Sequence, residues 1–98
     1  MIHWTERAAA NLIAIGDYIA QDNPVAARAW LDRLRRHAEL APEAPLAGRR
    51  VPELDRDDVR ETFLRSYRLV YRVDPDGITV LTVFEGHRLF REVDPEKR

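Results

Sequence analysis

The chain has 98 residues, no cysteine and a formal net charge of -1 at pH 7. The lack of cysteine excludes disulfides, thiolate chemistry and cysteine-ligated metal, and the near-zero charge argues against a protein that holds nucleic acid by bulk electrostatics. No segment reaches membrane-spanning length, so we expect a soluble, cytoplasmic protein that makes no membrane contact. The length favours a single domain over residues 1–98, with a tail from about residue 89.

Two amphipathic helices are predicted in the first half of the chain. Thr5 is a good N-cap after a short apolar strand at residues 2–4, and apolar residues then recur at helical spacing. Asn23 can cap a second helix that begins at Pro24, because the N–H that proline lacks would have no partner at that position. This helix should continue to about Leu40 and pair with the first as an antiparallel hairpin.

The middle of the chain, residues 41–58, is predicted to be a structured loop, since it contains three prolines and a glycine. Within it, Val51–Leu54 is expected to form a short edge strand, because Pro52 would leave one side of that strand unpaired. His37, near the end of the second helix, is expected to be exposed, where its cation would favour the helix C-terminus.

Three antiparallel strands should follow, at residues 59–63, 67–73 and 78–85. Valine, isoleucine, threonine and aromatic residues dominate them, which suits a partly buried pleated surface. Between the last two, the sequence Asp74-Pro75-Asp76-Gly77 predicts a type I turn, with Gly77 as a left-handed residue that closes the loop as a bulge. The preceding turn contains no glycine.

The strand at 67–73 should have one apolar face and one cationic face, because successive side chains alternate. Arg68 and Arg72 lie on the cationic face, with Arg60 on the neighbouring strand, and packing does not require them there. We therefore expect an accessible arginine surface. The last strand is apolar on both sides and should lie inside the sheet, with Ile78, Val80 and Phe84 on one face and Leu81 and Val83 on the other.

These elements predict an α+β fold in which a short N-terminal strand precedes an antiparallel two-helix hairpin packed on a small antiparallel sheet, in the order β-α-α-β-β-β. The residues expected in the core are Leu12, Ile15, Ile19, Trp30, Leu34, Leu69, Tyr71, Val80 and Phe84.

No sequence motif for catalysis, metal binding or cofactor binding is found. The one group of chemical interest joins Arg68 and Arg72 on the sheet to His87 and Arg88 after the last strand. A histidine beside arginines could act as a general acid or base on a ribose–phosphate bond, with the guanidiniums stabilising the charged transition state. A solvated cationic face is the other explanation, so these residues alone leave the function open.

Several short motifs follow one another along the chain. They are Trp4-Thr5, Asp17-Tyr18-Ile19-Ala20 leading to Asp22-Asn23-Pro24, Gly48-Arg49 with Val51-Pro52-Glu53-Leu54, Val59-Arg60-Glu61, the strand from Tyr67 to Val73, and Gly86-His87-Arg88. In this order and at this spacing they resemble the RelE/ParE superfamily of bacterial toxins from type II toxin–antitoxin modules, over almost the whole chain.

The resemblance implies a toxin that is neutralised by a cognate antitoxin in a hetero-oligomer, with no cofactor and no metal. ParE-like members of the superfamily poison DNA gyrase by binding it, whereas RelE-like members cut mRNA on the ribosome. A gyrase-binding surface would include Arg60, Arg68, Arg72, His87 and Arg88. A ribonuclease would use Arg68, His87 and Arg88 as its catalytic residues.

The resemblance favours the gyrase-directed branch and a protein that is not an enzyme. Lys97 is the only lysine, whereas the nuclease branch uses a cluster of lysines and arginines. The region after Arg88 contains no tyrosine, the other residue type that this branch uses near its C-terminus. His87 is the feature that keeps the ribonuclease as the alternative.

Overall fold

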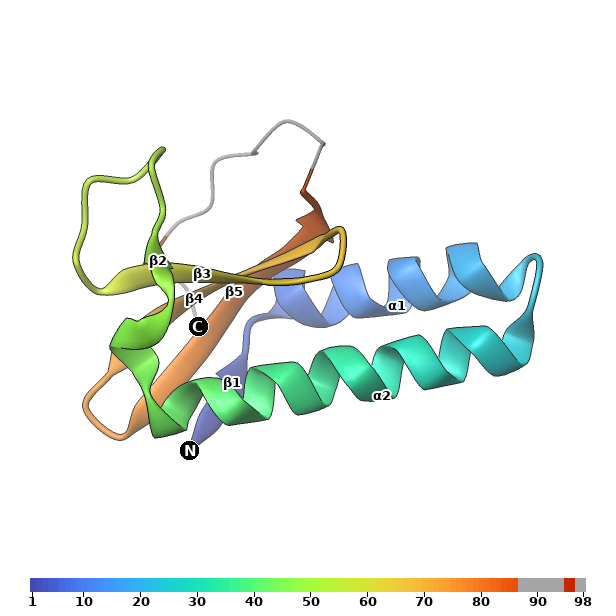
Figure 1. The fold of residues 1–98 in the computed structure, drawn as a ribbon, viewed down its shortest axis with the longest axis horizontal. Helices are drawn as coiled ribbons and strands as arrows, with labels where there is room; N and C mark the ends of the chain where they lie inside the picture. Colours follow the sequence, from blue (N-terminus) through green and yellow to red (C-terminus); the bar gives the residue numbers. More distant parts are fainter. Residues whose placement is uncertain (87–94, 97–98) are drawn as a thin grey trace.

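The computed structural model of the chain describes residues 1–86 and 95–96 (Figure 1). The elements are, in chain order, β1 (Ile2–Trp4), α1 (Glu6–Ala20), α2 (Pro24–Leu40), the short 3-10 helices η1 (Ala41–Glu43) and η2 (Pro45–Ala47), β2 (Arg49–Arg50), β3 (Val59–Leu64), β4 (Tyr67–Asp74) and β5 (Gly77–Glu85). The α+β prediction is confirmed. The tail expected from about residue 89 lies almost wholly outside the described residues.

The described strands form a five-stranded sheet in the order β1-β5-β4-β3-β2. β5 lies inside the sheet, between β1 and β4, as its two apolar faces predict. β1 runs parallel to β5, with Ile2 opposite Ile78 and Trp4 opposite Val80, so the sheet is mixed and not wholly antiparallel as predicted. The remaining neighbours are antiparallel.

The edge strand lies earlier in the chain than predicted. Arg49–Arg50 pairs with β3, whereas the predicted strand Val51–Leu54 forms a turn in which the Leu54 N–H donates to the Val51 carbonyl at 3.1 Å. Val51 is only 1% exposed, because its side chain packs into an apolar cluster on the sheet. Burial of this valine, followed by a proline that cannot donate to a ladder, ends the strand.

Both helix caps are confirmed. The Thr5 side chain accepts a hydrogen bond from the Ala8 N–H at 3.0 Å, and the Asn23 side chain accepts one from the Ala26 N–H at the same distance. Thr5 is also buried, and its hydroxyl donates to the Leu81 carbonyl at 3.1 Å. The N-cap of the first helix is therefore hydrogen-bonded to β5.

The turn between β4 and β5 differs from the prediction. Asp74 pairs with Gly77, so the loop is two residues long and Gly77 does not close it as a bulge. Gly77 has a φ of 152°, and a Cβ there would lie 1.7 Å from the Met1 carbonyl oxygen, which accepts the Ile78 N–H. The glycine is required by the close approach of the N-terminus. The glycine-free turn before β4 contains Arg65 at a φ of 53°.

A register shift between Val70 and Tyr71 changes which side chains of β5 share a face. Val83 joins the helix-side core with Ile78 and Val80, whereas Phe84 packs with Leu81 on the opposite side of the sheet. The predicted grouping of Val83 and Phe84 is therefore wrong, because strict alternation does not anticipate the shift.

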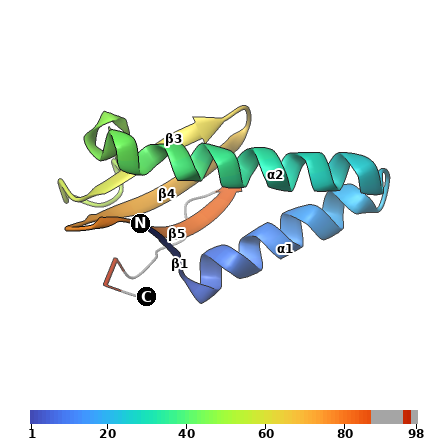
Figure 2. The same ribbon diagram turned by 90° about the horizontal axis from the view of Figure 1, so that it is seen from below.

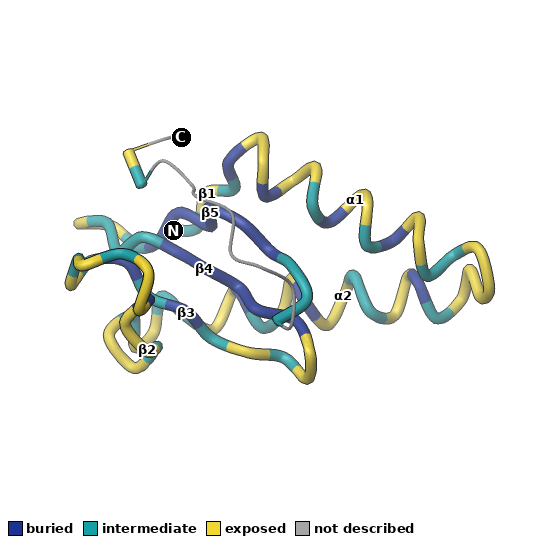
Figure 3. The backbone as a smooth tube through the Cα atoms, turned by 90° about the horizontal axis from the view of Figure 1, so that it is seen from above, coloured by how far each residue is buried: buried dark blue, intermediate teal, exposed yellow. Residues whose placement is uncertain are grey.

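Most of the predicted core is confirmed, and burial is most continuous along β4 and β5 (Figure 3). The predicted residues that are buried on the helix side are Leu12, Leu34, Leu69, Tyr71 and Val80. Ile15 and Trp30 are half-buried against that cluster, and Ile19 is half-buried as well. Phe84 belongs to the smaller cluster on the open face of the sheet.

The helix hairpin covers one face of the sheet with only part of its length. Figures 1 and 2 show its closed end, where α1 passes into α2, extending well past the strands. Among residues 1–86 and 95–96, no helix combines the length and the apolar composition needed to cross a bilayer.

Candidate binding surfaces

The sheet face opposite the helices carries an ion cluster instead of an accessible arginine surface. The Arg68 Nε donates to a Glu61 carboxylate oxygen, and its two terminal nitrogens donate to the Glu53 carboxylate at 2.9 and 3.2 Å. The side chain of Arg68 is 8% exposed and that of Glu61 is fully buried. The prediction that Arg68 lies on an accessible surface is wrong, because the loop after β2 folds over the sheet and brings Glu53 onto it.

Arg49 extends this cluster to the sheet edge. Its Nε donates to Glu61 at 2.8 Å, so that carboxylate bridges two guanidiniums. We call Arg49, Glu53, Glu61 and Arg68 the sheet-face ion cluster; its formal charges cancel. Arg68 also lies 5.4 Å from the centre of the Phe84 ring.

The cluster holds Arg68 and Glu53 in their charged forms. Burial lowers the pKa of Arg68, but its hydrogen bonds to Glu53 and Glu61 outweigh burial and raise that pKa above the ordinary value. The hydrogen bond from Arg68 lowers the pKa of Glu53. The Arg68 guanidinium and the Glu53 carboxylate therefore remain an ion pair near neutral pH.

Arg72 is also engaged by its neighbours. Its guanidinium donates to Asp74 at 2.7 Å, to the Thr79 hydroxyl at 3.1 Å and to the Pro95 carbonyl at 2.8 Å. Burial raises the pKa of Asp74, but hydrogen bonds from Arg72 and Thr79 outweigh it, and the net pKa is lowered. As with Arg68, the prediction of an accessible Arg72 is wrong.

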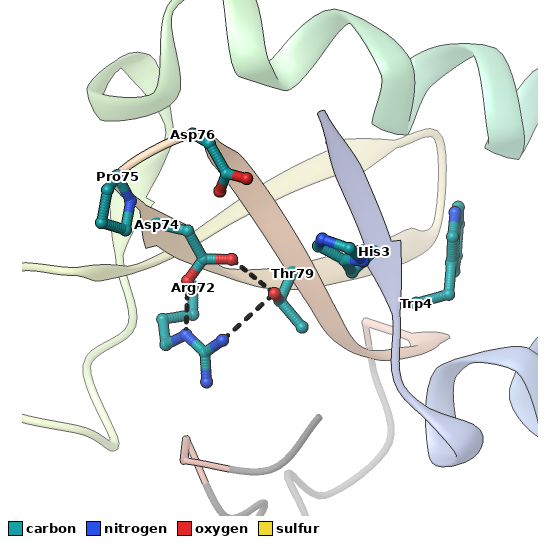
Figure 4. Close-up of a pocket in the computed structure, with 7 residues that line it drawn as sticks. All are labelled: His3, Trp4, Arg72, Asp74, Pro75, Asp76 and Thr79. Carbon is teal, nitrogen blue, oxygen red and sulfur yellow. Dashed lines mark hydrogen bonds and ion pairs between the residues drawn. The ribbon is translucent and has the colours of Figure 1, made fainter.

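A cavity of about 370 Å³ opens beside Arg72, between β1 and the end of the β4–β5 hairpin (Figure 4). His3 and Trp4 line it from β1. The side chains of Arg72, Asp74 and Thr79 form hydrogen bonds with one another in the wall of this cavity. In the described part of the chain, no three histidine or acidic side chains are grouped to hold a metal ion.

Arg60 fixes the loop next to β2. Its guanidinium donates to the backbone carbonyls of Asp57 and Gly48 at 2.8 and 3.2 Å. The Tyr71 hydroxyl donates to the Pro45 carbonyl at 2.6 Å, and a Cβ at Gly48 would lie 2.3 Å from that hydroxyl oxygen. The Gly48-Arg49 motif therefore has a packing explanation. Arg60, predicted to contact a target, orders its own loop.

The histidines predicted from the sequence have different outcomes. His87 lies outside the described residues, as does Arg88, so their predicted roles stay predictions. His37 is half-buried and not exposed as predicted, with its Nε2 at 3.0 Å from the Thr62 hydroxyl oxygen. Burial lowers the pKa of His37.

A groove of about 320 Å³ lies between α1 and the end of β5. β1 pairs only with Ile78–Val80 of β5, and beyond that pairing Asn11 of α1 accepts the Val83 N–H at 3.0 Å. Tyr18, which is 68% exposed, and the ring of Tyr67 line the groove. A groove with both polar and apolar lining thus adjoins a segment of β5 whose neighbour on the α1 side is the Asn11 side chain and not another strand.

Comparison with protein families identifies the family to which the chain belongs. The family model described as "ParE toxin of type II toxin-antitoxin system, parDE" matches residues 2–90. The chain belongs to the ParE toxin family. As a member of that family, within the RelE/ParE superfamily, it is a toxin of the type II toxin–antitoxin class, and the superfamily assignment made from the motifs is confirmed.

Individual relatives of this ParE-family chain agree with the assignment. The protein Y4kP of Sinorhizobium fredii, named as a toxin, is 33% identical over 96 residues, covering 94% of each chain. Toxin RelE2 of Caulobacter vibrioides is 48% identical over 46 residues, which are 47% of this chain and 52% of that toxin. A chain of the chromosomal ParDE toxin–antitoxin system of P. aeruginosa has the same fold, with a TM-score of 0.70, 24% identity and coverage of 86% and 92% of the two chains.

Sequence reasoning missed the two glutamates that organise the sheet face of this ParE-family chain. Glu61 is separated from Val59 by one residue on a strand, so alternation directs it to the face that carries Val59 and Arg68. That pattern could have identified Glu61. Glu53 lies in a loop, where no periodicity reveals its direction.

Proposed function

We propose that this ParE-family toxin inhibits DNA gyrase by binding it and has no catalytic activity of its own. The observation that carries the proposal is the neutralisation of Arg68 by Glu61 and Glu53. A guanidinium stabilises a phosphoryl transition state when its donors point at the developing charge. The three nitrogens of Arg68 point instead at two carboxylates of the same chain.

The alternative is a ribosome-dependent mRNA endoribonuclease that uses Arg68, His87 and Arg88. The local match of 48% identity to toxin RelE2 favours it. In that case Arg68 would have to leave Glu53 and Glu61 before it could contact a phosphate.

The two functions are distinguished by assaying induced cells in parallel for gyrase-linked DNA breaks with SOS induction, and for mRNA cuts at codon positions on translating ribosomes. For a gyrase inhibitor we expect DNA breaks with intact transcripts, and His87→Ala should be tolerated or only weaken binding. Loss of a general acid or base costs about 10²- to 10⁴-fold in rate, so codon-positioned cuts that disappear in His87→Ala would overturn the proposal. His3→Ala, an exposed histidine on β1, is the matched control.

We also propose a cognate antitoxin, a short acidic protein encoded next to the toxin, that forms a hetero-oligomer with it in the cytoplasm. The groove between α1 and β5 is the proposed docking site, because it adjoins the segment of β5 beyond its pairing with β1, and such a segment can accept an added strand or helix. A partner that binds only the folded toxin should raise its melting temperature.

Ala14→Arg should weaken this stabilisation, because Ala14 is exposed and lines the groove. Ala29→Arg, an exposed alanine on α2 outside the groove lining, is the matched control. If the neighbouring gene product neither binds the toxin nor relieves growth inhibition, the antitoxin proposal fails. Equal antitoxin binding by Ala14→Arg and Ala29→Arg would exclude this groove as the docking site but would not contradict the existence of an antitoxin.

A further inference from the structure

A second groove, of about 440 Å³, runs between α1 and α2 at the closed end of the hairpin. Most of the surface that lines it is apolar. Its apolar lining consists of Ile13, Gly16, Ala20, Ala27 and Leu31, and we call it the hairpin groove. Only Leu31 among these residues also packs against the helix-side core cluster, so the groove is separate from the contact between hairpin and sheet.

The hairpin groove lies where the two helices approach each other closely. Gly16 is buried, and a Cβ added to it would lie 2.8 Å from a methyl carbon of Leu31. Ile13, on the α1 side of the groove, is 64% exposed. A large apolar side chain therefore stands in solvent beside a hollow that could receive one of similar size, at the end of the hairpin that extends past the sheet (Figure 2).

The rim of the hairpin groove is charged, with two residues of each sign. Asp17 is on α1, and Arg28, Asp32 and Arg35 are on α2. Asp32 and Arg35 face each other at 3.9 Å across exposed side chains, a separation at which little free energy is gained. The described part of the chain shows no ion pair for Asp17 or Arg28.

We propose that the hairpin groove is the interface between two copies of this chain, packed hairpin against hairpin about a two-fold axis. A two-fold interface must be self-complementary, and an apolar projection beside an apolar hollow with charges of both signs at the rim meets that condition. Ile13 of each copy enters the groove of the other, and the aspartates of one rim face the arginines of the other. Because the rim carries two arginines and two aspartates, it offers no net positive charge to an acidic antitoxin segment.

The test is the oligomeric state of the full chain alone, measured by sedimentation velocity over a series of concentrations. Wild type should pass from monomer to dimer as concentration rises. Burying an isoleucine contributes about 1.5 to 3 kcal/mol, so Ile13→Glu should raise the dimer dissociation constant at least about 10-fold. Leu46→Glu is the matched control, because Leu46 is 61% exposed and lies outside the groove.

Thiol labelling provides an independent measurement. The natural chain has no cysteine, so Ile13→Cys introduces a single thiol whose reaction with a maleimide should slow as concentration rises and the dimer covers it, whereas the reaction of Leu46→Cys should not slow. Unchanged denaturation midpoints of both glutamate variants would show that folding is intact.

Three results would overturn the proposal. They are a monomer at every concentration, a dimer that Ile13→Glu leaves unchanged, and a monomer whose antitoxin binding Ile13→Glu abolishes, which would assign the groove to the antitoxin. The dimer does not depend on the cellular target, so failure of the gyrase proposal would leave these measurements interpretable.

Discussion

Glu61 is a fully buried carboxylate on the open face of the sheet. A fully buried carboxylate loses its hydration, a cost that is offset only when charged donors replace the lost water. Arg49 and Arg68 supply those donors, one to each oxygen. Each guanidinium also lies over a phenylalanine, at 5.7 Å from Phe63 and 5.4 Å from Phe84. The charges of Arg49, Glu61 and Arg68 therefore stabilise contacts within the chain.

Removing Arg68 should be far more costly than removing a surface ion pair. Arg68→Met leaves Glu61 buried with Arg49 as its remaining partner, and we expect a loss of about 3 kcal/mol in the free energy of unfolding, measured by urea denaturation. Because the hydrophobic replacement of both partners removes the buried charge, adding Glu61→Leu should recover part of this loss.

The control for this pair of variants is Asp32→Ala, which breaks the exposed contact with Arg35 and should cost less than about 1 kcal/mol. Equal midpoints for Arg68→Met and Asp32→Ala would contradict the structural role of the sheet-face ion cluster.

At the scale of elements, the hairpin is held to the sheet by apolar residues of unequal burial. Leu34 of α2 is fully buried in the helix-side core. Trp30, one turn earlier, is half-buried. Its ring lies 5.7 Å from that of Tyr67 in an edge-to-face arrangement, and the Arg33 guanidinium lies over the Trp30 ring, 4.7 Å from its centre. Leu34 is smaller than Trp30, but its whole side chain is removed from water when the protein folds.

Leu34→Ala should therefore destabilise the fold by about 3 to 5 kcal/mol, since it leaves a cavity in a packed core. Trp30→Ala should cost about 2 to 3 kcal/mol, because part of its ring is already in water. Leu40→Ala, at a position 61% exposed, should change stability by less than about 0.5 kcal/mol. A lower chemical denaturation midpoint for Trp30→Ala than for Leu34→Ala would refute this packing order.

At the scale of the whole molecule, the sheet separates two environments that respond differently to acid. On the helix side, burial lowers the pKa of His37. On the open side, hydrogen bonds from arginines lower the pKa of Glu53 and of Asp58. Acid should therefore weaken the fold in two separate steps.

The first step should begin as the pH falls below the ordinary histidine value of 6.5, because the unfolded chain then binds a proton that folded His37 resists. The second should begin below the ordinary values of 4.5 for Glu53 and 3.8 for Asp58, and stability is lost as the pH falls through their lower folded values. Urea midpoints across pH measure both steps.

His37→Gln should remove the first step and leave the second, whereas His3→Gln, at an exposed position, should remove neither. A first step of unchanged size in His37→Gln would exclude this histidine as its source.

Local patterns were sufficient for much of the fold. Thr5 and Asn23 cap the helices as predicted, and Pro24 begins α2, because capping depends on residues within one turn of each other. The two-sided apolar pattern of residues 78–85 correctly indicated a strand inside the sheet. Phe84 was assigned to the wrong face, because the register shift beside Val70 depends on how two strands pair.

The sequence by itself determined the helix hairpin, the three main strands and the family, since each follows from short-range periodicity or from motifs in order. Only the tertiary structure decided that Arg68, Arg72 and Arg60 are engaged within the chain. Their partners include Glu53, Glu61, Thr79 and the Gly48 carbonyl, which come from loops or from neighbouring strands. Alternation tells which face an arginine occupies; whether that face is open depends on segments distant in sequence that fold over it.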